Sequence, residues 1–203
     1  AMVPHLGQIA DVVLVGGGVA NNFLAADGKP IFNSYLEESV INDSRKAVDF
    51  VKLAHQLLST NHGKIIYPLD AIAATGINQI KTTSVNLINP LSFIKLDPKL
   101  MYLDIGPQTI NLYTEIILQA QTIFWNGPMG VFEKPTFATG TKKIAQAIAQ
   151  SPALSVLGGG DTISAINQFH LADRYDYVSA AGGATLEFLA GLKLPGITPM
   201  VIR

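Results

Sequence analysis

Two patterns of apolar and polar positions alternate along this chain. Short, nearly continuous apolar runs are typical of strands buried on both faces of a sheet, and they occur at 11–15, 64–69, 85–88, 100–104, 122–125, 154–157 and 176–179. Between them, apolar positions recur with helical spacing near 19–27, 43–60, 107–120, 137–150, 161–170 and 183–191. This alternation predicts an α/β fold, a doubly wound (Rossmann-like) three-layer sandwich with a mainly parallel sheet.

Local signals support some of these helices. The longest has apolar residues on one face, namely Ala47, Val48, Val51, Ala54 and Leu58. Ser34 and Glu37 have the spacing of a capping box, which marks a helix start, and Pro107 stands where a first helical turn tolerates proline. Segment 76–99 follows neither pattern, so we expect a short strand pair or an irregular excursion there.

Clusters of glycine follow three of the predicted strands. They occupy 16–18, begin the Gly-Gly-Gly-Asp string at 158–161 and end the Ala-Ala-Gly-Gly string at 180–183. Because glycine has no Cβ, its backbone can pass close to a ligand and aim N–H groups at it. A helix that starts there adds unpaired N–H groups and a positive dipole end. Carboxyl ends of parallel strands share one edge of the sheet, so these junctions predict a cradle for a nucleotide polyphosphate.

A fourth junction, Asn-Gly-Pro-Met-Gly-Val-Phe-Glu at 126–133, follows the strand at 122–125. Its first three residues are ordinary turn chemistry. Val131 and Phe132 then form an apolar wall beside one acid, Glu133, which would suit a nucleotide base and a ribose hydroxyl. The alternative is a tight loop with Glu133 in solvent.

Two further features each have two interpretations. The carboxylate of Asp161 can face Mg²⁺, which takes only one or two protein carboxylates and fills its shell from phosphate and water. Alternatively, Asp161 only caps its helix. The glycines at 16–18 either lie under a flat purine ring or allow close packing of a helix on the sheet.

Composition narrows the function classes. Charged residues make up 14% and hydrophobic residues 48% of the chain. This composition fits a sheet of buried parallel strands, or a protein that buries part of its surface against another domain or chain. The net charge of −1 argues against a broad nucleic-acid surface, which needs clustered Lys and Arg. No apolar run approaches the roughly 18 residues of a membrane span, and no signal-peptide pattern begins the chain. With zero cysteines, disulfides and thiolate metal sites are excluded, but their absence does not indicate a compartment. The default expectation is a cytoplasmic protein that binds neither nucleic acid nor membrane.

Two familiar nucleotide motifs are absent from the chain. A dinucleotide fingerprint needs Gly-x-Gly-x-x-Gly, but the third glycine position holds Asn21 in the first cluster and Ile163 in the second. No Gly-x-x-x-x-Gly-Lys-Ser/Thr string occurs. These failures disfavour a dehydrogenase of similar architecture.

Taken together, the strings resemble those of phosphoglycerate kinases. The resemblance rests on motifs in the same order, at 104–107 (Asp-Ile-Gly-Pro), 126–133, 158–162 (Gly-Gly-Gly-Asp-Thr), 183–189 (Gly-Ala-Thr-Leu-Glu-Phe-Leu) and 194–196 (Leu-Pro-Gly). It covers Leu6 to Ile197 and matches the C-terminal, nucleotide-binding half of that two-domain enzyme. It therefore implies one nucleotide-binding domain over residues 1–203, with the N-terminal substrate domain absent from this sequence.

The resemblance implies reversible phosphoryl transfer between ATP and 3-phosphoglycerate, giving 1,3-bisphosphoglycerate and ADP, in glycolysis and gluconeogenesis. This chain would carry the Mg²⁺-ATP/ADP site. It would be inactive alone, because the basic half that grips 3-phosphoglycerate and a segment with two lysines precede residue 1 in the family. Within the chain, no Lys or Arg lies within ten residues of 158–161.

Carried over residue by residue, the resemblance assigns the nucleoside contacts. Gly16 and Gly17 line the adenine slot, and Glu133 holds the ribose. Asn126 lies near the triphosphate. Tyr102 stands beside the adenine where the family usually has glycine, and its ring would either stack on the base or block the slot.

The resemblance also assigns the phosphate contacts, which fall on one string: Gly158, Gly159, Gly160, Asp161 and Thr162. Asp161 is the expected metal ligand. Gly182 and Gly183 are the expected catalytic positions, because they open a helix whose N-terminus faces the moving phosphoryl group. Ala181 stands where the family has glycine. Together with Tyr102 it supports the alternative of a non-catalytic nucleotide-binding homologue.

The resemblance bears on assembly as well. We expect the full-length protein to be monomeric. An edge or central strand lost with the absent half would leave apolar surface bare, so we expect the isolated domain to be able to dimerise.

Overall fold

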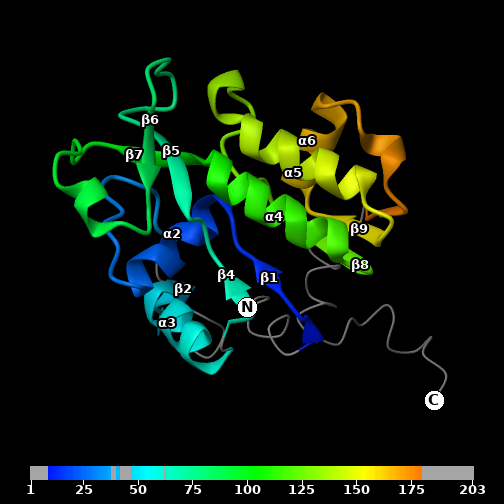
Figure 1. The fold of residues 1–203 in the computed structure, drawn as a ribbon, viewed down its shortest axis with the longest axis horizontal. Coiled ribbons are helices and arrows are strands. Elements are labelled where there is room, and N and C mark those ends of the chain that lie inside the picture. Colours follow the sequence, from blue (N-terminus) through cyan, green and yellow to red (C-terminus); the bar gives the residue numbers. More distant parts are fainter. Residues whose placement is uncertain (1–8, 38–39, 42–46, 62, 180–203) are drawn as a thin grey trace.

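The structure is a computed structural model that describes residues 9–37, 40–41, 47–61 and 63–179 (Figure 1). Its helices are α2 (Gly17–Ala26), α3 (Phe50–Thr60), α4 (Pro107–Gln119), α5 (Thr139–Gln150) and α6 (Gly160–Gln168). Its strands are β1 (Val13–Leu14), β2 (Val40–Ile41), β3 (Ala47–Val48), β4 (Ile65–Ile66), β5 (Asp70–Ala74), β6 (Thr83–Asn86), β7 (Met101–Ile105), β8 (Thr122–Asn126), β9 (Leu154–Gly158) and β10 (Tyr177–Val178). The alternation of strands and helices confirms the predicted α/β class.

Two of the sheets are parallel. β1 pairs with β4, with Val13 opposite Ile65. β8, β9 and β10 form a second sheet in which β9 is the middle strand. These five strands lie where the apolar runs predicted them.

A third sheet is antiparallel, with the order β6-β5-β7. β5 follows directly after the run predicted as one strand over 64–69, of which only Ile65–Ile66 is strand. Within 76–99 the structure has one strand, β6, whose partner β5 lies before this segment, so the strand pair expected inside 76–99 is not found and the rest is irregular apart from a short 3-10 helix at Pro90–Phe93. Apolar side chains cover β5 and β7 on both faces, with Leu24 on one side and Phe137 on the other. An apolar run of this kind does not reveal strand direction.

The helix predicted over 43–60 begins only at Phe50, so its predicted start is wrong. Ala47 and Val48 instead form β3, which pairs antiparallel with β2. The side chain of Asp49 caps α3, accepting a hydrogen bond from the Lys52 N–H at 3.0 Å. The capping box predicted at Ser34 is also wrong, because Ser34 lies in irregular chain and its Oγ accepts from the Tyr102 N–H at 2.9 Å.

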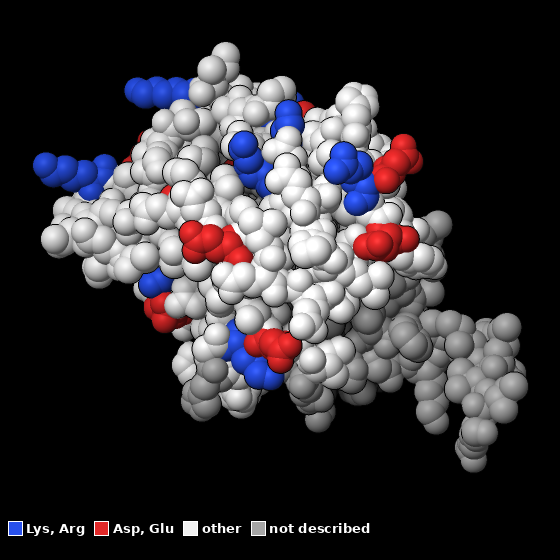
Figure 2. All heavy atoms as spheres, turned by 45° about the vertical axis from the view of Figure 1, so that its right-hand side comes forward, with Lys and Arg blue, Asp and Glu red and all other residues white. Residues whose placement is uncertain are grey.

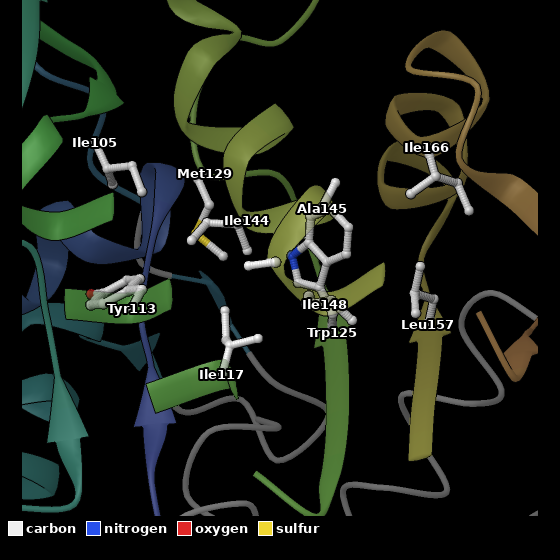
Figure 3. Packing of buried hydrophobic residues seen from close by; sticks show 11 residues of the cluster. Ile105, Tyr113, Ile117, Trp125, Met129, Ile144, Ala145, Ile148, Leu157 and Ile166 are labelled. Carbon is white, nitrogen blue, oxygen red and sulfur yellow. The ribbon is translucent and has the colours of Figure 1, made fainter. Parts of the chain in front are cut away.

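Helix α4 joins several parts of the fold. The buried Asp70 carboxylate caps its N-terminus, accepting from the N–H groups of Gln108 (3.0 Å) and Thr109 (2.8 Å). Further along, the Tyr113 hydroxyl donates to the carbonyl oxygens of Val15 (2.7 Å) and Ile66 (3.0 Å). The apolar face of α4 packs into the main core cluster, together with α5, β8 and β9 (Figure 3).

Asn22 is a buried polar residue without a partner. It lies on α2 with 2% of its surface exposed, and neither its Oδ1 nor its Nδ2 makes a hydrogen bond. An unsatisfied buried amide costs about 1–3 kcal/mol, and leucine has a similar size. We therefore expect Asn22→Leu to raise the free energy of unfolding by about 1–3 kcal/mol in urea denaturation.

The neighbouring residue provides a matched control. Asn21 is equally buried at 3% exposure, but its Nδ2 donates to the Tyr35 carbonyl at 2.8 Å. Asn21→Leu is therefore expected to lower stability. If both substitutions destabilise the chain alike, Asn22 is not an unsatisfied group.

Charged side chains are sparse on the surface. On the face that Figure 2 shows, acidic and basic residues are scattered and interspersed, without a broad basic stretch. Separately, no helix among the described residues has the length and apolarity needed to cross a membrane.

Candidate functional site

The loops that follow β1 and β8 touch each other. The Gly17 N–H donates to the Met129 carbonyl at 3.2 Å. A Cβ on Gly16 would collide with the Met129 sulfur, and one on Gly17, whose φ is +57°, would meet the Pro128 carbonyl at 2.6 Å. Glycine is thus required here for the close approach of two loops, which differs from the packing of a helix on the sheet that was one interpretation of this cluster. The adenine contacts of Gly16 and Gly17 stay a prediction.

The loops that follow β8 and β9 are also joined. β8 and β9 are paired up to Asn126 and Gly158. Beyond that point the Gly127 N–H donates to the Oγ1 of the fully buried Thr162 at 2.7 Å. Gly159 has a φ of +90°, and a Cβ there would collide with Oδ1 of Asn126. Three of the four predicted junctions therefore meet at one edge.

Helix α6 begins at this edge without a side-chain cap. Its N-cap is Gly159, and no side chain accepts from the first turn, so Asp161 does not act as the cap. Within the described chain, the N–H groups of Gly160, Asp161 and Thr162 have no hydrogen-bond acceptor. A Cβ on Gly160 would meet no atom within 4 Å. Free N–H groups at a helix N-terminus with open space around them favour an anion.

The donor set fits a magnesium ion bound through a nucleotide better than an all-protein metal site. Asp161 is exposed in the first turn of α6. No group of three or more His, Cys, Asp or Glu side chains able to hold a metal occurs in the described residues. Mg²⁺ commonly takes one or two carboxylates and completes its shell with phosphate and water. Asp161 with a bound polyphosphate would meet that requirement.

The wall predicted after β8 is partly turned inward. Phe132 is buried and packs against Ala138 and Ala165. Val131 is half-buried, with its N–H bonded to the Leu103 carbonyl at 2.8 Å. Glu133 is exposed. The wall available to a base is therefore Val131, and the exposed carboxylate of Glu133 is compatible with both interpretations of the loop.

Tyr102 lies in the packing between β7 and the segment after α2. Its hydroxyl donates to the Pro30 carbonyl at 2.7 Å, and its ring meets Phe32 edge-on, with centroids 6.2 Å apart. Burial raises the pKa of Tyr102 above its usual range. Within the described chain, no hydrogen bond or ring contact joins this side chain to the loops after β1, β8 or β9. This gives no support to the prediction that the Tyr102 ring blocks the adenine slot. Its place beside the adenine stays a prediction.

Two buried residues, which the sequence did not indicate as site residues, lie against the loop after β8. The Asp104 carboxylate accepts from the N–H groups of Ile105 (2.9 Å) and of Gly140 near the start of α5 (2.7 Å). A Cβ on Gly130 would collide with the same carboxylate. The Oγ1 of Thr141 accepts from the N–H groups of Met129 (3.1 Å) and Gly130 (3.2 Å). Burial raises the pKa of Asp104 to about 7, although the hydrogen bonds from Gly140 and Ile105 act to lower it.

The comparison with known families identifies the chain. The family model described as phosphoglycerate kinase matches residues 1–192. The chain belongs to the phosphoglycerate kinase family. It is 38% identical over 202 residues to the phosphoglycerate kinase of Nitratidesulfovibrio vulgaris. The matched region covers 100% of this chain and 48% of that enzyme.

Solved phosphoglycerate kinases have the same fold. The structure from Coxiella burnetii has a TM-score of 0.83 at 38% identity and matches 97% of this chain and 48% of its own. The structure from Pyrococcus horikoshii has a TM-score of 0.75 at 34% identity, with coverage of 96% and 46%. The chain thus spans about half the length of the phosphoglycerate kinases it matches.

The glycine cluster at 180–183 lies outside the described residues. It contains Gly182 and Gly183, the expected catalytic positions, and Ala181. The helix predicted over 183–191 lies there too. Their roles stay predictions that follow from the family resemblance.

Proposed function

We propose that this chain is the nucleotide-binding half of a phosphoglycerate kinase. Joined to the other half, it catalyses reversible phosphoryl transfer between ATP and the carboxylate of 3-phosphoglycerate, giving 1,3-bisphosphoglycerate and ADP. It does so in the cytoplasm, within glycolysis and gluconeogenesis. The observation that carries the proposal is the meeting of the loops after β1, β8 and β9, joined by the Gly17–Met129 and Gly127–Thr162 hydrogen bonds.

The nucleotide would lie across these loops with its phosphates at α6. The free N–H groups of Gly160 and Asp161 would donate to phosphate oxygens, and the dipole of α6 would favour their negative charge. Asp161 and Gly182–Gly183 complete the proposed phosphate end. Asp161 would hold Mg²⁺ together with the phosphates, and the ion would offset the charge that develops during transfer. Gly16, Gly17 and Val131 would flank the base, with Glu133 at the ribose.

The residues around these loops supply rigidity. Thr162 ties the loop after β8 to α6, and Thr141 holds the N–H groups of Met129 and Gly130. Asn126 lies against Gly159, so the loops after β8 and β9 are closely packed. Phosphoryl transfer depends mainly on positioning and charge stabilisation. A rigid set of main-chain donors is the contribution that this half makes to catalysis.

The isolated chain is expected to bind nucleotide weakly and to transfer no phosphate. It spans about half the length of the phosphoglycerate kinases it matches, and no Lys or Arg lies within ten residues of 158–161. Titration calorimetry with Mg-ADP should show one site with a dissociation constant on the order of 0.1–1 mM. A coupled assay on the same sample should show no turnover above the blank.

Titration of Mg²⁺ alone serves as the control, and it should give no comparable heat. Absence of binding at millimolar Mg-ADP would count against the nucleotide site. Turnover by the chain alone would show that the residues outside it are dispensable for the chemistry.

A further inference from the structure

A cavity of about 410 Å³ opens beside the antiparallel sheet β6-β5-β7. One wall is the hairpin that joins β5 to β6, which projects at the top of the view in Figure 1. The other wall is segment 95–100, which leads into β7. Each wall contributes one lysine, Lys81 from the hairpin and Lys95 from the segment, so the hollow is called the lysine cavity below. Its volume is within the range of sites that hold small molecules.

The lysine cavity is separate from the proposed nucleotide site. None of the residues that line it belongs to the loops after β1, β8 or β9. Thr83 in its wall is paired with Ala73 across the hairpin, so these two side chains share a face of the sheet. Ala73 is in the core cluster of Leu100, which also lines the cavity, whereas Val131 packs against a different cluster. A ligand in the lysine cavity would therefore not occupy the place proposed for the nucleotide base.

Positive charge prevails around the lysine cavity. Segment 71–99 contains three lysines and one acid, Asp97, which gives a local net charge of +2 in a chain whose net charge is −1. Lys81 and Lys95 are exposed, and neither forms a salt bridge within the described part of the chain. A hollow in which one sign of charge prevails concentrates ions of the opposite sign. The cavity therefore favours an anion.

Asp97, the acid that lines the cavity, is partly engaged by its own turn. Its Oδ1 accepts a hydrogen bond from the Lys99 N–H at 2.8 Å, and its carbonyl oxygen accepts one from the Leu100 N–H at 3.1 Å. Its Oδ2 has no hydrogen-bond donor among the described residues. A carboxylate oxygen accepts hydrogen bonds and donates none, so it suits a hydroxyl group and repels a second carboxylate.

The other lining groups suit a phosphate ester. The hydroxyls of Thr75 and Thr83 and the amide of Gln79 are hydrogen-bond donors. Lysine is a common ligand of phosphate, and a phosphate monoester carries about −1.5 to −2 charges at pH 7, which matches the two lysines. Leu96 and Leu100 give the cavity an apolar floor, which suits the carbon chain of an ester.

We propose that the lysine cavity binds a small phosphate monoester that carries hydroxyl groups. Lys81 and Lys95 hold the phosphate from the two walls, and Asp97 accepts a hydrogen bond from a hydroxyl of the ligand. The carbon chain lies on Leu96 and Leu100. The site is independent of the nucleotide site, so this inference does not rest on the proposed function.

An NMR titration of the intact chain with glycerol 2-phosphate tests the proposal. This probe is a phosphate monoester with two hydroxyl groups. The amide signals of Thr75, Gln79 and Leu96 should shift together and saturate, with a dissociation constant on the order of 1 mM. Inorganic phosphate lacks the hydroxyls, and succinate lacks both the hydroxyls and the phosphate. Each should bind about threefold more weakly or worse, because a hydrogen bond to Asp97 is lost.

Several outcomes would overturn the assignment. The amides of Gly160 and Asp161 report separately on the first turn of α6, so shifts confined to them would place the phosphate there and not in the lysine cavity. Absence of a saturable shift would refute the site. Equal affinity for succinate would refute the choice of a phosphate ester. Calorimetry with Mg-ADP is a separate measurement, so the two proposals can fail independently.

Substitutions of lysine test whether the two walls act together. Lys81→Gln and Lys95→Gln should each weaken glycerol 2-phosphate binding by about threefold, and the double variant by about tenfold. Lys52→Gln is the matched control, because Lys52 is exposed on α3 and forms no salt bridge in the described residues. It removes the same charge outside the cavity and should leave the affinity unchanged. Equal weakening by all three single substitutions would show a diffuse charge effect and would refute the site. Mg-ADP affinity should be unchanged in every variant.

Discussion

The free energy of unfolding of this chain is expected to fall as the pH rises from about 4 to about 7. Burial raises the pKa of Asp104 from 3.8 to about 7, although hydrogen bonds from Gly140 and Ile105 act the other way. Between these values the folded chain holds a proton that the unfolded chain has lost. Stability therefore decreases with rising pH over this window, by at most about 1.4 kcal/mol per pH unit, and is level above it.

Urea denaturation at a series of pH values measures this slope. Asp104→Asn removes the titrating group and should flatten the curve between pH 4 and pH 7. Asp176 is a suitable unaltered reference, because hydrogen bonds from Ser155 lower its pKa and confine its effect to more acidic solutions. A slope that persists in Asp104→Asn would assign the dependence to another group.

Much of the fold was predictable because burial leaves a periodic trace in the sequence. The predicted ranges at 107–120 and 154–157 differ by one residue from α4 and β9. Helix α4 buries one stripe of side chains, and the strand β9 packs on both faces. The sequence did not indicate β5, because this strand is mostly alanine and alanine also favours helices.

The errors at the start of α3 have a similar cause. Ala47 and Val48 fit the apolar face of a helix by spacing, but two adjacent apolar residues fit a short strand equally well. Their pairing with Val40 and Ile41 is a tertiary contact that local spacing does not encode. Ser34 shows the same limit, because its hydroxyl is used by Tyr102, 68 residues away in the sequence.

The candidate site was predictable to the extent that it depends on strand exits. Glycines after parallel strands must gather at one edge, and those after β1, β8 and β9 do so. The sequence marked Asp104 only as part of the motif at 104–107 and Thr141 not at all, because both act on main-chain N–H groups of glycines and Met129 far along the chain.

Replacing Gly160 by alanine is expected to weaken Mg-ADP binding at least tenfold without harming the fold. No atom lies within 4 Å of a Cβ built on Gly160, and its φ lies outside the left-handed region. Alanine also favours helices by up to about 1 kcal/mol over glycine, so the free energy of unfolding should stay level or rise. The new methyl group would occupy the space beside the N–H groups that we propose hold phosphate.

Gly76→Ala is the matched control for this substitution. A Cβ there makes only an ordinary contact of 3.7 Å with Gln79, and Gly76 lies after β5, outside the proposed site. Its affinity for Mg-ADP should equal that of the parent chain in calorimetry. If Gly160→Ala binds Mg-ADP as tightly as Gly76→Ala does, the phosphates do not lie over the first turn of α6. The Gly17–Met129 and Gly127–Thr162 contacts would then be explained by loop packing alone, because a ligand held by main-chain donors must respond to a methyl group placed among them.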